Sequence, residues 1–245
     1  MSNNKFYLII LILLLSFSFK PTEAKSLGYA FSGGGARGYA HIGMLKVLAE
    51  EGIYPEYIAG TSFGALVGSL YSMGYNPTEI ESLTTRWDVL DLFDEHYRRK
   101  DLYIGQKRWP SYGNFQLRIK ENGQPSYPTG LINGVKLEQA LAQVYMPASS
   151  YRDFSKLPVS FAGLYLDLDT GELIVSTSGS LMQTIRAAIS IPSLFTPFEL
   201  DGHRYIDAGI LQNIPVPQVR EIGADKVITF KVNADLTEKN PDNLI

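Results

Sequence analysis

Near the start of the chain, a strand-like apolar run twice leads through a glycine-rich turn into a helix-like run. Residues 27–31 lead into a helical stretch at 39–51, and residues 57–59 lead into a second one at 65–73. Within 39–51 the apolar side chains recur near the period of an α-helix. Hydrophobic strands that alternate with helices are typical of a mainly parallel central sheet with helices on both faces. We therefore expect an α/β fold.

The same alternation continues over the rest of the chain. Residues 88–113 are irregular and charged, which predicts a surface excursion. No internal repeat or low-complexity linker interrupts the pattern, so residues 25–245 are expected to form one domain. Further helices are expected at 77–87, 133–145, 181–190 and 216–222, and further strands at 115–119, 159–166, 172–176, 203–206 and 226–232.

Residues 60–64 read Gly-Thr-Ser-Phe-Gly, a G-x-S-x-G sequence between the second strand and its helix. This pattern is typical of a sharp strand-to-helix turn that exposes the hydroxyl of its central serine. A side chain at Gly60 or Gly64 would crowd so tight a turn. The helix that follows adds unpaired N–H groups and a positive dipole end behind the serine. Ser62 is therefore the candidate nucleophile, and a plain glycine-rich connection is the alternative.

The first turn has the sequence Ser-Gly-Gly-Gly-Ala-Arg-Gly over residues 32–38. Gly33, Gly35 and Gly38 match G-x-G-x-x-G, which predicts a dinucleotide site when an acidic residue ends the second strand. Here residues 60–62 end that strand without a carboxylate. Consecutive glycines at a helix start also expose N–H groups that can bind a developing oxyanion. The oxyanion interpretation is therefore favoured over the nucleotide one.

The sequence leaves the general base open, because a serine nucleophile commonly gives its proton to a histidine. The chain has only three histidines, at His41, His96 and His203. The first is expected to pack within a helix, the second lies in a charged stretch and the third lies in a hairpin turn. A carboxylate is the alternative, and Asp207, after a strand-like run, is one of several candidates. An aspartate is a weak base with a pKa of about 3.9, but alignment in a dry site can make it effective.

Three motifs, in this order, resemble those of the patatin-like phospholipases, a family that uses a serine–aspartate dyad. They are the glycine loop at 33–38, the G-x-S-x-G turn at 60–64 and an Asp-Ala-Gly element at 207–209. The similarity extends over about 27–233 and includes the segment 213–216. Three ordered motifs are far more specific than any single one. The resemblance implies a three-layer α/β/α fold and the activity of a phospholipase A-type lipid acyl hydrolase.

By this resemblance Ser62 is the nucleophile and Asp207 is the base that activates it. Arg37 would help to order the glycine loop or meet the phosphate of a substrate. The resemblance also implies a lipid substrate, contact with a membrane surface during catalysis and no cofactor. The loop that supplies the oxyanion hole consists of Gly33, Gly34, Gly35, Arg37 and Gly38.

One departure from the family pattern is Ala208, which stands where a glycine usually follows the aspartate and precedes Gly209. Alanine is small, so we expect the geometry of the site to survive. The substitution is the sequence support for an alternative function: a catalytically weak or inactive lipid-binding or effector protein with the same fold.

Composition argues against several other classes of function. The formal net charge is −3, without the basic excess that is typical of nucleic-acid binding. The chain has no cysteine, and its three histidines lack the spacing of a metal motif. Asp167 and Asp169 lie at an expected hairpin tip, where turn chemistry explains them better than metal binding. We therefore expect neither a metal nor a nucleic-acid partner, and the sequence does not indicate an oligomeric state.

Residues 1–24 have the pattern of a secretory signal peptide. Lys5 gives a basic start, an apolar run covers 6–19, and Thr22 and Ala24 place small residues before an expected cleavage site. The run is shorter than the about twenty residues that a membrane-spanning helix needs, and an uncleaved anchor is the alternative. We therefore expect export to the periplasm or the outer membrane, or secretion.

Overall fold

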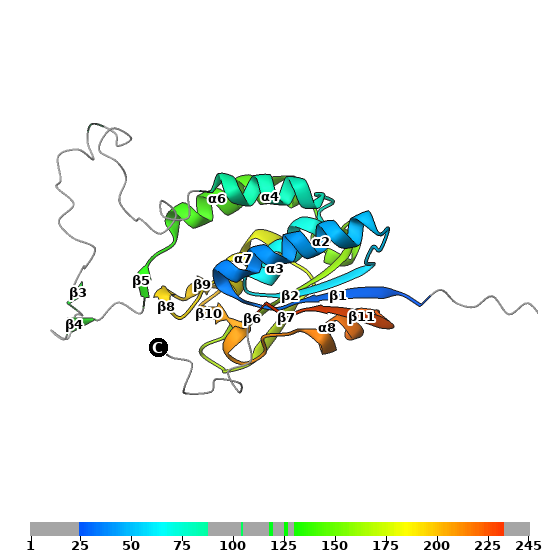
Figure 1. Cartoon of the computed structure of the whole chain (residues 1–245). Coiled ribbons are helices and arrows are strands. Elements are labelled where there is room, and N and C mark those ends of the chain that lie inside the picture. The colour runs from blue at the N-terminus through cyan, green and yellow to red at the C-terminus, as the bar shows by residue number, and fades with distance from the viewer. Residues whose placement is uncertain (1–24, 88–103, 105–117, 120–124, 127–129, 233–245) are drawn as a thin grey trace, which may run out of the picture.

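The computed structural model describes residues 25–87, 104, 118–119, 125–126 and 130–232 (Figure 1). The expected signal peptide at 1–24 lies outside these residues, as does the charged stretch 88–113 apart from residue 104. Within the described ranges, no helix is both long enough and apolar enough to span a membrane.

A seven-stranded sheet forms the centre of the fold, in the order β11-β1-β2-β6-β10-β9, with β7 also paired to β6. Strands β11, β1, β2 and β6 are parallel, as the alternation of strands and helices predicts. The two predicted hairpins supply the antiparallel strands, β7 beside β6 and β9 beside β10. The bounds are Leu27–Phe31 (β1), Tyr57–Thr61 (β2), Ser160–Asp167 (β6), Leu173–Ser176 (β7), Phe198–Leu200 (β9), His203–Asp207 (β10) and Lys226–Phe230 (β11).

Helices cover both faces of this sheet, which gives the expected three layers (Figure 1). α2, α3 and α7 lie on one face, and α8 lies on the other; α4 and α6 pack outside the first group. The bounds are Ala40–Glu50 (α2), Phe63–Ser72 (α3), Pro77–Arg86 (α4), Val135–Tyr145 (α6), Leu181–Ala188 (α7) and Val216–Glu221 (α8).

Short elements complete the described part of the chain. Two small strand pairs lie outside the central sheet: β3 with β4, antiparallel, and β5 with β8, parallel. Their bounds are Arg118–Ile119 (β3), Pro125–Ser126 (β4), Gly130–Ile132 (β5) and Ser193–Phe195 (β8). Four 3-10 helices cover Gly35–Tyr39 (η1), Met146–Ala148 (η3), Phe154–Lys156 (η4) and Ala208–Ile210 (η5).

The two faces of the sheet are packed differently, as β1 illustrates. Tyr29 and Phe31 belong to the large core under α2 and α3, whereas Ala30 belongs to a smaller cluster that includes Val219 of α8. This follows from the alternation of side chains along a strand. A Cβ at Gly28 would overlap the Val219 side chain. Small residues on this face therefore let the short helix α8 lie close against the strands.

The expected elements are confirmed where the structure describes them, with bounds shifted by at most two residues. The one shift that bears on function is in β2, which continues through Gly60 and Thr61 because both pair with β6. α3 correspondingly begins at Phe63. Ser62 is thus the single residue between strand and helix.

Candidate functional site

The G-x-S-x-G turn and the Asp-Ala-Gly element meet because two strands end head to head along one edge of β6. β2 runs parallel to β6 and pairs Thr61 with Leu164, whereas β10 runs antiparallel and pairs Asp207 with Tyr165. β7 pairs with the same two β6 residues, so it takes the opposite edge. Thr61 and Asp207 therefore occupy successive positions along β6, and Ser62 follows Thr61 directly.

Ser62 has φ 56 and ψ −130, a backbone conformation that non-glycine residues rarely adopt. The turn is held by close backbone contacts at both glycines. A Cβ at Gly60 would lie 2.5 Å from Ala65 Cα, and one at Gly64 would lie 2.5 Å from the carbonyl oxygen of Ser32. The requirement for glycine at 60 and 64 is therefore steric, as the sequence predicts. The Ser62 side chain is only 5% exposed and stands at the N-terminus of α3.

The Asp207 carboxylate accepts a hydrogen bond of 2.7 Å from the Gly209 N–H, and the Ser62 side chain is close enough to lower the pKa of this carboxyl. Asp207 is 6% exposed. Burial raises the pKa of its carboxyl above the usual aspartate value, and the Ser62 side chain and the Gly209 N–H oppose that rise. A carboxylate with a raised pKa is a stronger base than a free aspartate, so this environment corrects the weakness noted for aspartate in general.

The glycine loop lies directly against the serine. A Cβ at Gly33 would lie 3.0 Å from Ser62 Cβ and 2.7 Å from Asn213 Oδ1. The N–H of Gly33 donates to the Asn213 carbonyl at 3.2 Å, so it is already used within the fold. The N–H groups of Gly34 and Gly35, by contrast, make no hydrogen bond within the described residues. These two are the N–H groups of the predicted hole that a ligand oxygen could meet.

The remaining loop residues have different surroundings. A Cβ at Gly38 would overlap the ring of Phe63, the first residue of α3, so this glycine lets η1 close onto the G-x-S-x-G turn. Arg37 donates its N–H to the Gly34 carbonyl at 3.2 Å, and its side chain is exposed. This bond comes from the main chain, so the expected role of the Arg37 side chain stays a prediction.

Ala208 fits its position without strain. It is fully buried in the small cluster on the α8 face, and among the described residues only Ser62, Ser193 and Asp201 combine a side chain with a positive φ. Ala208 begins η5 and needs no left-handed backbone. The geometry therefore gives no reason for a glycine at this position.

Neither described histidine reaches Ser62 or Asp207. His41 is fully buried and donates from Nε2 to the Ser32 carbonyl at 2.9 Å, which agrees with the predicted packing role. Burial lowers its pKa, although the bond to Ser32 opposes that shift. His203 stands at the opposite end of β10 from Asp207, and four residues of strand span roughly 13 Å. His96 lies outside the described residues.

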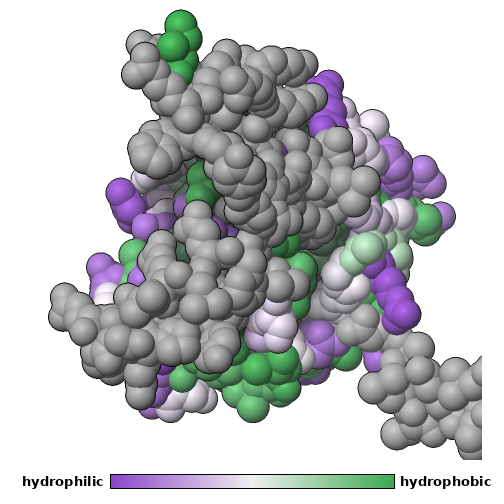
Figure 2. Space-filling view, turned by 90° about the vertical axis from the view of Figure 1, so that its left-hand side faces the viewer, coloured by the Kyte–Doolittle hydropathy of each residue, from purple (hydrophilic) through white to green (hydrophobic). Residues whose placement is uncertain are grey.

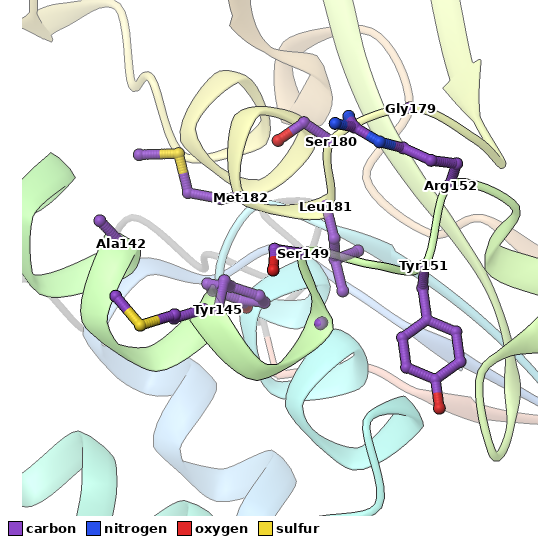
Figure 3. A pocket seen from close by; sticks show the side chains of 11 residues that line it. Ala142, Tyr145, Ser149, Tyr151, Arg152, Gly179, Ser180, Leu181 and Met182 are labelled. Carbon is purple, nitrogen blue, oxygen red and sulfur yellow. The ribbon is translucent and has the colours of Figure 1, made fainter.

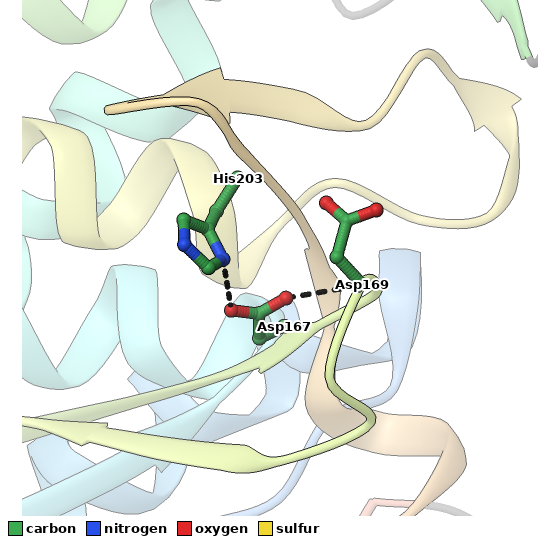
Figure 4. A group of neighbouring side chains, drawn as sticks. All are labelled: Asp167, Asp169 and His203. Atoms are coloured by element: carbon green, nitrogen blue, oxygen red, sulfur yellow. Dashed lines mark hydrogen bonds and ion pairs between the residues drawn. The ribbon is translucent and has the colours of Figure 1, made fainter.

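His203 instead joins two acidic residues of the β6–β7 turn (Figure 4). Donor atoms of Asp167, Asp169 and His203 lie within 4.8 Å of one another, the spacing of a possible cation site. Asp167 accepts from His203 Nδ1 at 2.8 Å and from the N–H groups of Asp169 and Thr170, and Asp169 is paired with Arg204. The carboxylates are thus engaged in turn and hairpin contacts, which agrees with the predicted turn chemistry.

A pocket of about 240 Å³ lies at the N-terminal end of α7, and neither Ser62 nor Asp207 lines it (Figure 3). Figure 3 shows Arg152 and Ser180 on one side of it and Tyr145 on another. Tyr145 shares a hydrogen bond of 2.5 Å with Ser69, in the second half of α3. No residue of the predicted site lines this pocket.

Sequence reasoning missed two groups that hold the site in place. Asn213, in a segment quoted only for its resemblance, binds the glycine loop, and the Thr61 hydroxyl donates to the Gln212 carbonyl at 3.2 Å. On the other side, the Ser190 carbonyl accepts from the Asp207 N–H at 2.9 Å. Each of these contacts joins residues that are distant in the sequence, so no local pattern predicts them. The only signal for Asn213 was that it lies in the segment 213–216, which resembles the family.

Comparison with known proteins gives consistent results. The family model described as "Patatin-like phospholipase" matches residues 29–220. An NTE family protein of Mycobacterium tuberculosis is 30% identical over 217 residues, which cover 87% of this chain and 51% of the relative. The neuropathy target esterase sws of Drosophila melanogaster is 27% identical, with coverages of 89% and 14%. The chain thus spans about half the length of the mycobacterial relative.

The solved structure of VipD from Legionella pneumophila superposes with a TM-score of 0.52 at 16% sequence identity, and covers 89% of this chain and 52% of that one. At this identity the match supports the fold alone. The family-model match covers most of the chain and all three motifs, and the chain belongs to the patatin-like phospholipase family.

Proposed function

We propose that this protein is a lipid acyl hydrolase of the phospholipase A type, with Ser62 as nucleophile and Asp207 as its base. The observation that carries the proposal is that the register along β6 brings the strained, buried Ser62 beside the buried Asp207 carboxylate. Strained backbone at a buried polar group is concentrated at functional sites. Family membership supports the substrate class, since the matched family is one of phospholipases.

In the first half-reaction, Ser62 Oγ bonds to the carbonyl carbon of the ester while its proton passes to the Asp207 carboxylate. The N–H groups of Gly34 and Gly35 hold the resulting oxyanion, helped by the N-terminal dipole of α3. When the tetrahedral intermediate collapses, the bond to the alcohol breaks and Asp207 returns the proton to the leaving oxygen. The products are a free alcohol or lysolipid and an acyl-serine.

In the second half-reaction, water attacks the acyl-serine carbonyl and gives a proton to Asp207. The same N–H groups stabilise the second oxyanion, and Asp207 protonates Ser62 Oγ as the fatty acid leaves. Atoms and charge balance over the cycle, and each step uses only groups of this chain and water. The raised pKa of Asp207 suits it to both directions of transfer.

We also propose that the site works against a lipid surface. Ile210 and Leu211 follow the Asp-Ala-Gly element directly and are 67% and 61% exposed. No charged residue occurs over 208–219, so this segment carries no charge that would oppose contact with acyl chains. Figure 2 looks onto the end of the molecule where β8, β9 and β10 lie in Figure 1, and shows a hydrophobic patch at its lower edge.

Export is the third part of the proposal. The signal pattern of residues 1–24 supports removal of that segment after Ala24. The N-terminal sequence of protein recovered from an expressing cell tests this directly. A mature chain that begins at Lys25 agrees with export, and an intact Met1 in the extracytoplasmic fraction would favour the uncleaved anchor.

The catalytic proposal is tested by hydrolysis of p-nitrophenyl butyrate and of acyl-labelled phosphatidylcholine vesicles by the parent, Ser62→Ala and Asp207→Asn. Loss of turnover in both variants, with their melting transitions intact, is the expected result. Full esterase activity in Ser62→Ala would refute the assignment. A folded parent that binds the vesicles without turnover would instead favour the catalytically weak or inactive lipid-binding or effector alternative.

A further inference from the structure

Arg186 is a buried cation in the second half of α7, and its side chain is only 1% exposed. Burying a charged group is costly unless it is paired and hydrogen-bonded. Its Nε donates to Glu138 Oε1 at 3.0 Å, but that side chain is 39% exposed. Replacement of buried ion pairs by apolar residues is often neutral or stabilising. Stability alone therefore gives a weak reason for an arginine here.

The guanidinium joins elements that are separate in the sequence. Its Nη2 donates to the Asn133 carbonyl before α6 at 2.9 Å, and its Cζ lies 5.5 Å from the ring centroids of Phe195 in β8 and Phe198 in β9. The turn into α6 closes tightly onto it. Gly134 has φ +83, and a Cβ there would lie 2.6 Å from Nη2.

The third guanidinium contact leads to the dyad. Arg186 Nη1 donates to Ser190 Oγ at 2.6 Å, and that hydroxyl donates back to the Arg186 carbonyl at 2.8 Å. Ser190 is fully buried, so both bonds fix the chain just beyond the end of α7. The Ser190 carbonyl in turn accepts the Asp207 N–H at 2.9 Å. The connection runs from Arg186 through Ser190 and Asp207 to Ser62.

We propose that Arg186 is a positioning residue, which fixes Ser190 and thereby holds Asp207 within hydrogen-bonding reach of Ser62. This inference rests on the proposed function of the dyad. Arg186 touches neither the reacting serine nor the carboxylate, and its action is geometric. Burial raises the pKa of Asp207, and the Ser62 side chain and the Gly209 N–H lower it. Arg186 is not among the groups that shift this pKa, so its proposed action on the carboxyl is through position and not through charge.

The test compares Arg186→Lys, Ser190→Ala and the double variant with the parent, using p-nitrophenyl butyrate. Lysine keeps the charge but lacks the planar fork that serves three partners. We expect kcat to fall at least tenfold in Arg186→Lys and at least fivefold in Ser190→Ala, with KM within twofold. Both changes break the same connection between Arg186 and Ser190. The kcat of the double variant should therefore lie no more than about twofold below that of Arg186→Lys.

Glu138→Gln is the matched control, because it removes the ion pair with Arg186 but leaves the bond to Ser190. It should lower the melting temperature and leave kcat within twofold. The pH profile gives a second readout. The neighbouring Ser62 side chain lowers the pKa of Asp207, so displacement of the carboxylate away from Ser62 should move the acidic limb of kcat/KM to higher pH. That shift is expected in Arg186→Lys and Ser190→Ala and absent in Glu138→Gln.

If the fold-losses of kcat in the two single variants multiply in the double variant, the two residues act independently and the proposal is overturned. A parent-like kcat in Arg186→Lys, with only a lower melting temperature, would also overturn it. If Arg186→Lys shows no melting transition, Ser190→Ala carries the test, and an unchanged kcat in it overturns the proposal. Ser62→Ala separates the two claims. If Ser62→Ala retains turnover, both the proposed dyad and the positioning role of Arg186 are refuted. If Ser62→Ala is inactive and Arg186→Lys has a parent-like kcat, only the positioning role is refuted.

Discussion

Substitution of Gly64 by alanine should damage the site without removing any reactive group. The new Cβ would lie 2.5 Å from the Ser32 carbonyl oxygen and 2.7 Å from that of Phe31, both at the entry to the glycine loop. These are backbone atoms, so no side chain can rotate away. Restoring ordinary contact requires that the loop and the G-x-S-x-G turn separate by roughly 0.9 Å or more in a close-packed interior.

A misplacement of about 1 Å at an active site can cost about 10²-fold in rate. We therefore expect Gly64→Ala to lower kcat/KM for p-nitrophenyl butyrate by about 10- to 100-fold, and the free energy of unfolding by about 1–3 kcal/mol through overpacking. Stopped assays of initial rate and thermal melting measure the two effects on the same preparation.

Gly68→Ala, one turn further along α3, is the control for stability. Its Cβ would lie 2.8 Å from Ile58 Cγ2, a side-chain atom of the core. It should lower the melting temperature with kcat/KM within about threefold of the parent, since the atoms it meets belong to side chains and not to the backbone of the loop. A Gly64→Ala protein with parent-like kcat/KM would refute the claim that the spacing between loop and serine governs the rate.

Three further predictions follow from the same geometry. Because Asp207 must be ionised to accept a proton and burial raises its pKa, kcat/KM should fall on acidification with a midpoint above the usual aspartate value; a midpoint at or below about 3.9 contradicts this. A carboxyl whose pKa is higher in the folded than in the unfolded state costs stability once the pH rises through these two pKa values, because the fold then contains an unfavourable charge. Asp207→Asn removes that charge. Its melting temperature should therefore exceed that of the parent at pH 7, and the difference should vanish in acid. The double variant Ile210→Ser/Leu211→Ser should lose turnover of vesicles but keep that of p-nitrophenyl butyrate, whereas Val47→Ser, at an exposed α2 position, should change neither; equal losses on both substrates would exclude a surface role.

Most of the fold could be predicted because its signals are local. Asp201 and Gly202 both have positive φ, as a tight hairpin requires, and an Asp-Gly pair between two strand-like runs marks that hairpin in the sequence. Glycines flanking Ser62 likewise mark the strand-to-helix turn. Such features depend on a few neighbouring residues, and the observed bounds agree with them closely.

The arrangement of the site could not be predicted in the same way. That Thr61 and Asp207 occupy adjacent positions along β6 depends on the register of two strand pairs, and register arises from the whole core. The sequence resemblance supplied the pairing of Ser62 with Asp207, and residue patterns alone left the base open.

Two finer features needed the tertiary structure. Gly33 was grouped with its neighbours as a donor to the oxyanion, but its N–H is paired with the Asn213 carbonyl, far away in the sequence. Arg186 looks like an ordinary polar residue of an amphipathic helix. Only the packing of α6, β8 and β9 around it turns it into a buried cation.

The central claim is that Ser62 is a nucleophile activated by Asp207 without a histidine. The most direct measurement is the rate at which a fluorophosphonate modifies the protein, with the modified peptide located by mass spectrometry. We predict a single adduct on Ser62, no adduct in Ser62→Ala, a rate at least about 100-fold lower in Asp207→Asn, where the general base is lost, and a parent-like rate in His203→Ala. An adduct on another residue, or a parent-like rate in Asp207→Asn, would contradict the account.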